Sequence, residues 1–287
     1  MRKMQDNKNS NVTTPSPQGG HGVGVTVIKV GGAVVENPDS LSSLIEQFAH
    51  LEGHKVLVHG GGRSATRIAT RLGIESHMVC GRRITDSEML DVVTMVYGGL
   101  VNKNLVAQLQ AQGVNALGLT GADMDVIRSH KRPEKLMTLE DGTQQMVDFG
   151  WVGDVDEADG QMLATLIGQG IVPVMAPLTH DKEGHILNTN ADTIASEVAC
   201  ALAPYFDVTL TYCFEKAGVL TDPDDDSSVI PHISSATYPQ LKADGIVSGG
   251  MIPKLDNAFA AISRGVKNVV ITHFANIDGT KGTCVER

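Results

Sequence analysis

The chain has 287 residues, 41% of them hydrophobic, and a formal net charge of −10 at pH 7. This length suffices for one large α/β domain or for two lobes that share a sheet. The acidic balance argues against a nucleic-acid partner, because nucleic-acid binding needs a basic surface. The cysteines lie far apart and form no CxxC pair, so the sequence predicts neither a zinc site nor a disulfide framework; they are Cys80, Cys200, Cys213 and Cys284.

The beginning of the chain carries no targeting or membrane signal. No apolar run approaches the roughly 20 residues that cross a bilayer, and there is no apolar signal-peptide core. We therefore expect a cytoplasmic protein with reduced thiols and no membrane partner. Residues 1–24 nearly lack large apolar side chains, which predicts a disordered N-terminal tail.

From Val25 onward, short β-branched runs alternate with segments of helical spacing. VTVIKV and KVLVH flank a segment with four apolar side chains on one helical face: Leu41, Leu44, Ile45 and Phe48. Further strands are expected at NALGL, IVPVM, DVTLTY and KNVVIT, which begin at Asn115, Ile171, Asp207 and Lys267. This alternation predicts an α/β fold, a three-layer α/β/α sandwich around a central, open, mainly parallel sheet. Residues 135–155 alternate in shorter steps, as a β-hairpin insertion would.

A lysine and two glycines end the first expected strand. Lys29 is followed by Gly31 and Gly32. Ligands of parallel sheets bind beyond the carboxyl ends of the strands, and glycines there let an anion approach backbone N–H groups. Lys29 can therefore meet a phosphate at this point, although a strand-end lysine in a glycine turn would look the same.

A second glycine turn, Gly60, Gly61 and Gly62, follows the next strand and leads into a helix expected from Ser64. Free amides and the helix dipole both favour an anion there. The turn is neither a P-loop nor a GxGxxG fingerprint. His59 before it is interpreted as structural.

Two further segments precede helices. Arg82 and Arg83 carry guanidinium forks suited to a carboxylate, or they form a solvated basic pair, and Asp86 is expected to cap the helix after them. Asn188 and Asp192 flank another helix start, where two amides and a carboxylate in five residues exceed what one cap needs.

The last such segment is SGGMIPK, which places Lys254 in the first turn of a helix. A cation at this position opposes the helix dipole unless an anion binds there. The conflict favours a functional lysine.

Six segments in this order resemble the acylglutamate-phosphorylating branch of the amino acid kinase family: VIKVGG, VHGGGR, GRRIT, NTNADT, GGMIPK and the final GT. The resemblance runs from about Val25 to the end of the chain. It implies the carbamate kinase-like fold of that family. It also implies ATP-dependent phosphorylation of the side-chain carboxylate of N-acetyl-L-glutamate, the second step of arginine biosynthesis.

Position by position, the resemblance implies that Lys29 and Lys254 neutralise the phosphoryl group in flight, while Asp192 holds both ammonium groups. Phosphate-binding positions would be Gly31, Gly32, Gly60 and Gly61. Substrate-binding positions would be Gly61, Gly62, Arg83 and Asn188. Mg²⁺ would arrive with the co-substrate ATP, without a resident metal site. Residues 25–203 would form the acylglutamate-binding lobe and residues 204–287 the nucleotide-binding lobe.

The segment from Cys213 to Lys216 departs from the Ser/Thr-Asp-Val-like stretch of the family, which leaves the adenine contacts open. The acidic run from Thr221 is interpreted as a solvated loop. N-succinyl-L-glutamate is the second substrate hypothesis, with Arg82 as a candidate for its extra carboxylate, and a catalytically silent nucleotide or amino-acid sensor is the third. Arginine-inhibited members of the family form hexamers through an apolar N-terminal helix. The tail here lacks that pattern, so we expect a homodimer without strong arginine feedback.

Overall fold

The computed structural model describes residues 22–139, 142–222, 224–249 and 251–287. The predicted disordered tail therefore lies almost wholly outside the described residues. Its boundary at residue 24 is one residue too long, because Gly24 already pairs with Asp207 in the first strand. No helix within the described ranges combines the length and apolar character that crossing a bilayer requires.

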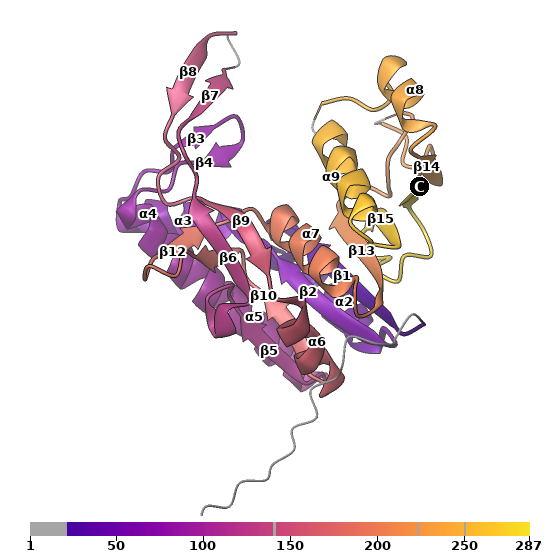
Figure 1. Ribbon diagram of the computed structural model, residues 1–287, viewed down its shortest axis with the longest axis horizontal. Coiled ribbons are helices and arrows are strands. Elements are labelled where there is room, and N and C mark those ends of the chain that lie inside the picture. The colour runs from indigo at the N-terminus through magenta and orange to yellow at the C-terminus, as the bar shows by residue number, and fades with distance from the viewer. Residues whose placement is uncertain (1–21, 140–141, 223, 250) are drawn as a thin grey trace, which may run out of the picture.

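An eight-stranded sheet forms the centre of the molecule (Figure 1). Its neighbours pair in parallel, except for the antiparallel pair β15–β16. The predicted mainly parallel sheet is thus confirmed, together with all six predicted strands. In spatial order the strands are β14 (His232–Ser234), β16 (Thr283–Glu286), β15 (Asn268–His273), β13 (Asp207–Phe214), β1 (Gly24–Val30), β2 (His54–His59), β10 (Val172–Met175) and β5 (Ala116–Leu119).

Helices cover both faces of this sheet, as the prediction of three layers requires. Alternate side chains of β1 point to opposite faces, so Val27 joins one buried cluster and Ile28 the other. The Val27 cluster packs against α6 (Gly160–Gly168), α7 (Ala191–Leu202) and α9 (Met251–Ser263). The Ile28 cluster packs against α1 (Gly32–Glu36), α2 (Pro38–His50), α3 (Gly62–Leu72), α4 (Ser87–Val93), η1 (Thr94–Val101) and α5 (Asn102–Ala111).

Smaller sheets extend from this body, and the largest of them, like the hairpin β3–β4, was not predicted. It has four strands, β12 (Ile186–Asn188), β11 (Leu178–His180), β6 (Ile127–Lys131) and β9 (Gly153–Ala158). The predicted hairpin is confirmed as the antiparallel pair β7 (Lys135–Thr138) and β8 (Gln144–Val147), but its predicted end at residue 155 is wrong, because residues 153–155 belong to β9 and pair with β6. A second small hairpin joins β3 (Met78–Val79) to β4 (Arg82–Arg83). The remaining elements are η2 (Asp123–Asp125) and α8 (Tyr238–Ala243).

The local arrangement agrees with several capping signals in the sequence. The Asp86 side chain accepts the Met89 amide at 2.8 Å and starts α4, as predicted. Asn190 caps α7 by accepting the amides of Asp192 and Thr193. The helix α3 begins at Gly62, two residues before the predicted start near Ser64, because the glycine turn itself continues into the first helical turn.

Candidate active site

A partly buried ion pair lies at the carboxyl end of β1. Lys29, the penultimate residue of that strand, is 8% exposed, and its Nζ lies 2.6 Å from Asp192 Oδ1. Because Asn190 caps α7, the carboxylate of Asp192 projects from the first turn of that helix toward the strand. The pair therefore fixes a lysine where parallel strands offer their ligand-binding edge.

A second lysine approaches the same place from the opposite side. Lys254, in the first turn of α9, places Nζ 3.7 Å from the centre of the Phe214 ring, and Lys29 Nζ lies 5.5 Å from that ring. Burial lowers the pKa of Lys254, the Asp192 charge opposes that shift, and Lys29 adds to it. Two lysines and one carboxylate leave a net positive charge that suits an anion.

The two glycine turns touch each other beside these lysines. A Cβ on Gly60 would stand 3.0 Å from the amide nitrogen of Gly32, and a Cβ on Gly61 would stand 2.9 Å from Cδ1 of Tyr97. A side chain at Gly60 would therefore push the two turns apart, and one at Gly61 would collide with the Tyr97 ring. Gly61 precedes α3 with no side chain capping it, so the turn brings backbone amides and a helix N-terminus to one point.

An open cleft of about 530 Å³, here named the Arg83 cleft, runs along the predicted substrate residues. The Arg83 guanidinium donates to Gly62 O at 2.9 Å and to Thr66 Oγ1 at 2.8 Å, so its orientation is fixed at the wall. The Asn188 amide donates to Thr85 Oγ1 at 2.9 Å. Predicted residues in the lining are Gly60, Gly61, Gly62, Arg82, Arg83, Asn188, Asp192 and Lys254.

A second cleft of about 480 Å³, the Phe214 cleft, lies beyond the ends of β1 and β13. Gly31, Gly32 and the segment from Cys213 to Lys216 line it. The segment that departs from the family pattern thus forms its wall. Burial raises the pKa of Cys213 to about 12, so this thiol stays neutral and is no nucleophile.

Gly62 and Lys254 line both clefts. A ligand in one cleft and a ligand in the other would therefore meet beside Lys254. Lys29 lines neither cleft, but it reaches the Arg83 cleft through its partner Asp192. The structure thus brings the predicted lysines, glycines, arginine and asparagine to one junction.

His59 is part of the support beneath the site. Its ring is fully buried, Nδ1 donates to Gly60 O at 2.9 Å, and Asn102 Nδ2 donates to Nε2 at 3.1 Å. Burial lowers the pKa of His59 to about 4, and Lys103 adds to the shift, so the ring is neutral near pH 7. This environment agrees with the structural interpretation of His59.

The roles of three residues at the site were not predicted from the sequence. Arg132 lines the Arg83 cleft and is held by Asp154 at 2.6 Å. Phe214 was noted only as a departure, yet its ring lies against both lysines. Glu36 accepts the Ser64 amide of α3 at 2.6 Å and so ties α1 to that helix. Arg132 lies in a basic run from Lys131 to Lys135, which was the one available signal for it.

A sequence model of the Amino acid kinase family matches residues 24–273. The chain belongs to the amino acid kinase family. It is 63% identical over 263 residues to a protein of Bacteroides thetaiotaomicron named acetylglutamate kinase, covering 92% of this chain and 98% of that protein. The acetylglutamate kinase of Methanopyrus kandleri is 40% identical, with 90% and 99% covered.

Solved structures agree on the fold. The protein smu.665 of Streptococcus mutans superposes with a TM-score of 0.70 at 27% identity, covering 91% of this chain and 98% of that one. A carbamate kinase of Giardia superposes with a TM-score of 0.62 at 16% identity, covering 92% and 99%. The predicted amino acid kinase fold is therefore confirmed.

Proposed function

We propose that this chain is an acetylglutamate kinase. It transfers the γ-phosphoryl group of ATP to the side-chain carboxylate of N-acetyl-L-glutamate and forms N-acetyl-L-glutamyl 5-phosphate and ADP, the second step of arginine biosynthesis. The observation that carries this proposal is the junction of the two clefts at Gly62 and Lys254. The relatives that bear this enzyme name cover nearly the whole chain and support the choice of acceptor.

The acceptor would occupy the Arg83 cleft and ATP the Phe214 cleft. Three arginines line the first of these, Arg82, Arg83 and Arg132, which suits a substrate with two carboxylates. The Phe214 cleft is bounded by Gly31 and Gly32, whose backbone can approach phosphates closely. We propose residues 25–203 as the acylglutamate-binding lobe and residues 204–287 as the nucleotide-binding lobe, with Gly31 and Gly32 of the first lobe lining the Phe214 cleft and Lys254 of the second lining the Arg83 cleft.

The chemistry requires positioning and charge stabilisation. A glutamate side chain has a pKa near 4.3 and is already ionised at neutral pH, so no general base is needed. A carboxylate oxygen bonds to the γ-phosphorus while the bond from that phosphorus to the β–γ bridging oxygen breaks, and ADP leaves. Lys29 and Lys254 would balance the charge on the phosphoryl oxygens, and Asp192 would hold Lys29 in place.

The residues around the clefts do not form a resident magnesium site. Among the described lining residues, Asp192 and Glu215 are the carboxylates, and Asp192 is already paired with Lys29. Mg²⁺ prefers several oxygen ligands and commonly binds through substrate phosphates. Mg²⁺ would therefore enter bound to ATP, and it would neutralise phosphate charge there.

N-succinyl-L-glutamate is the second candidate acceptor, and one observation favours it. Arg82 is exposed and lines the Arg83 cleft, so it is available to a carboxylate at the end of a longer acyl group. Arg82→Met should then raise the KM for N-succinyl-L-glutamate and leave the KM for N-acetyl-L-glutamate nearly unchanged.

The test is acyl phosphate formation trapped by hydroxylamine, with N-acetyl-L-glutamate, N-succinyl-L-glutamate and free L-glutamate compared at equal Mg–ATP. Hydroxamate from the acetylated substrate above the other two supports the proposal. Preference for the succinylated substrate would move the assignment to the second candidate. ATP binding without hydroxamate from any acceptor would favour a nucleotide or amino-acid sensor.

We also propose that the protein is cytoplasmic, because the reaction uses ATP. We propose that it forms a homodimer, because η1 exposes apolar side chains that a second copy could cover. Met95 is 55% exposed and Leu100 is 47% exposed on that helix. Light scattering at micromolar concentration should give twice the mass of the chain. A hexamer would contradict the proposal.

A further inference from the structure

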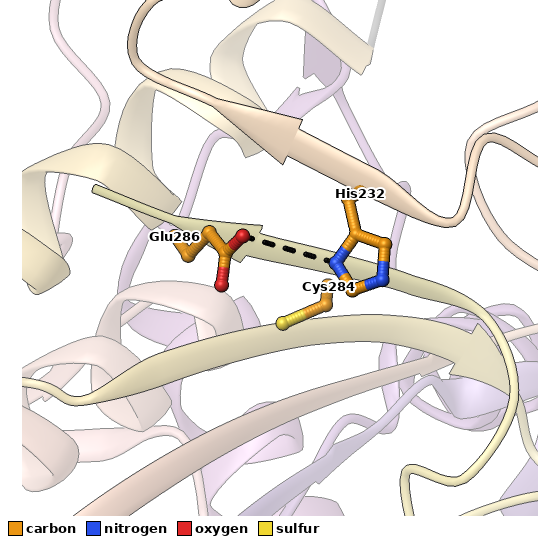
Figure 2. A group of neighbouring side chains, drawn as sticks. All are labelled: His232, Cys284 and Glu286. Carbon is orange, nitrogen blue, oxygen red and sulfur yellow. Dashed lines mark ion pairs between the residues drawn. The ribbon is translucent and has the colours of Figure 1, made fainter.

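Three metal-ligating side chains gather at the outer edge of the central sheet, outside the linings of both clefts. His232 lies on the edge strand β14, while Cys284 and Glu286 lie on its neighbour β16 (Figure 2). One ligand atom from each, a ring nitrogen, the thiol sulfur and a carboxylate oxygen, lies within 4.8 Å of the other two.

The pairing of the strands explains why these side chains meet. His232 is the direct partner of Cys284 in the parallel pair β14–β16, and Ser234 is the partner of Glu286. Residues two apart on a strand point to the same face, so Cys284 and Glu286 share one face of β16. Figure 2 shows the His232 ring and the Glu286 carboxylate turned toward each other.

We propose that His232, Cys284 and Glu286 bind one Zn²⁺ ion. Zinc accepts nitrogen, sulfur and oxygen ligands, and three protein ligands leave the fourth tetrahedral position to water. Bonds of about 2.0–2.3 Å place tetrahedral ligand atoms about 3.5 Å apart. His232 Nδ1 and Glu286 Oε1 are 3.9 Å apart. A small rotation of either side chain would therefore bring these two atoms to the separation of about 3.5 Å that tetrahedral zinc requires.

The exposure and the charges of the cluster suit such an ion. The side chains of His232 and Glu286 are 69% and 50% exposed, so they are free to adjust. The Cys284 thiol is partly buried, and a cysteine thiol ordinarily carries its proton at neutral pH before an ion binds. Formation of the zinc–thiolate bond releases that proton to solvent. The thiolate and the carboxylate then neutralise both charges of Zn²⁺.

A second cluster of this kind, Asp181, Glu183 and His185, has a simpler explanation. Asp181 Oδ1 accepts the amides of Glu183 and His185 at 2.7 and 3.1 Å, and Oδ2 contacts His185 Nδ1 at 2.6 Å. These bonds already account for the turn. An ion would have to displace them, whereas the His232 cluster is joined by one ion pair at 3.9 Å.

The ion would cross-link the edge of the sheet. The strand β14 is three residues long and joins the sheet through β16. A bond from His232 to the ion, and from the ion to Cys284 and Glu286, would hold this edge strand in register. The proposed zinc ion would therefore stabilise the edge of the sheet, apart from the kinase chemistry.

The test uses the full chain without a polyhistidine tag, stripped with a chelator. Titration with Zn²⁺ by calorimetry should give one ion per chain and release a proton. Titration with Co²⁺ should give the near-ultraviolet charge-transfer band of a thiolate ligand. Cys284→Ser should abolish the band and weaken Zn²⁺ binding by more than about tenfold, the low end of what even indirect changes at metal sites cost.

Cys80→Ser is the matched control, because Cys80 is an exposed thiol that donates to Thr138 O and is not part of the His232 cluster. It should keep the band and the affinity. Glu286→Gln provides a second variant in case Cys284→Ser fails to fold, and it should weaken Zn²⁺ binding in the same way. Equal Zn²⁺ affinity in the wild type and in both ligand variants, or a Co²⁺ complex without the thiolate band, would overturn the proposal.

Discussion

Replacement of Lys254 by methionine separates catalysis from stability. The substitution keeps the length of the side chain over Phe214 and removes the charge at the junction of the two clefts. Two charges about 4 Å apart at an effective dielectric constant of about 20 interact by about 4 kcal/mol. Loss of one preorganised donor commonly costs about 10²–10³ in kcat, or about 3–4 kcal/mol. We therefore expect kcat to fall by about 10²–10³.

The same substitution should not lower the stability of the fold. Burial lowers the pKa of Lys254, so the folded state binds its proton more weakly than the unfolded state does. At pH 7, well below the usual pKa of lysine, the charged ammonium therefore destabilises the fold. Among the described residues, no carboxylate forms an ion pair with it. Lys254→Met should keep or raise Tm while it removes activity.

The assay measures kcat and KM for both substrates together with Tm by scanning calorimetry. Lys267→Met is the control, since Lys267 is 61% exposed and pairs with Asp207 away from the clefts. Exposed pairs contribute at most about 1 kcal/mol, so this control should keep full activity. If Lys254→Met retained kcat within about tenfold, the placement of Lys254 at the transferring phosphoryl group would be refuted.

Three further substitutions test the surroundings of the junction. Gly61→Ala would force a Cβ to 2.9 Å from Tyr97, so both Tm and kcat should fall, with a stability loss of about 1–3 kcal/mol. Asp192→Asn leaves Lys29 without the carboxylate at 2.6 Å and should lower kcat by about 10². For His59, burial lowers the pKa from 6.5 to about 4, so the unfolded state gains its proton first as the pH falls. Stability should drop between those pH values by up to about 1.4 kcal/mol per unit, and His59→Gln should flatten the drop.

Each of these three substitutions has a control variant or a result that would contradict its prediction. Gly168→Ala places a Cβ where no atom lies within 4 Å, so it should leave kcat unchanged and Tm unchanged or higher. Unaltered kcat in Asp192→Asn would show that Lys29 needs no anionic partner. A pH dependence of Tm in His59→Gln as steep as that of the wild type would assign the acid sensitivity to other groups.

The sequence predicted the site best where strands end. Lys29 lies near the end of β1 and Gly60 directly follows β2, and the ends of such adjacent parallel strands converge on one edge, so the spatial meeting of the two glycine turns was accessible from spacing alone. Asn190 and Asp86 carry local capping signals that require no tertiary knowledge. The resemblance to the family then linked these turns to the distant Lys254.

Other features depend on contacts that no local pattern encodes. The four-stranded sheet joins β11 to β6 and β9 from distant parts of the chain. The Phe214 ring at the end of β13 meets Lys254 because α9 packs against α7, β15 and β16, which are tertiary contacts. His232 meets Cys284 because β14 and β16 pair in parallel, whereas cysteine spacing had predicted no zinc site.

Phosphoryl transfer to an acylglutamate at the junction of the two clefts underlies all the roles proposed for these residues. Its most direct test measures ADP and trapped hydroxamate in one reaction with Mg–ATP and N-acetyl-L-glutamate, with the wild type beside Lys254→Met. We expect equal amounts of ADP and hydroxamate from the wild type and background levels of both from the variant. ADP without hydroxamate, or equal hydroxamate from both proteins, would contradict it.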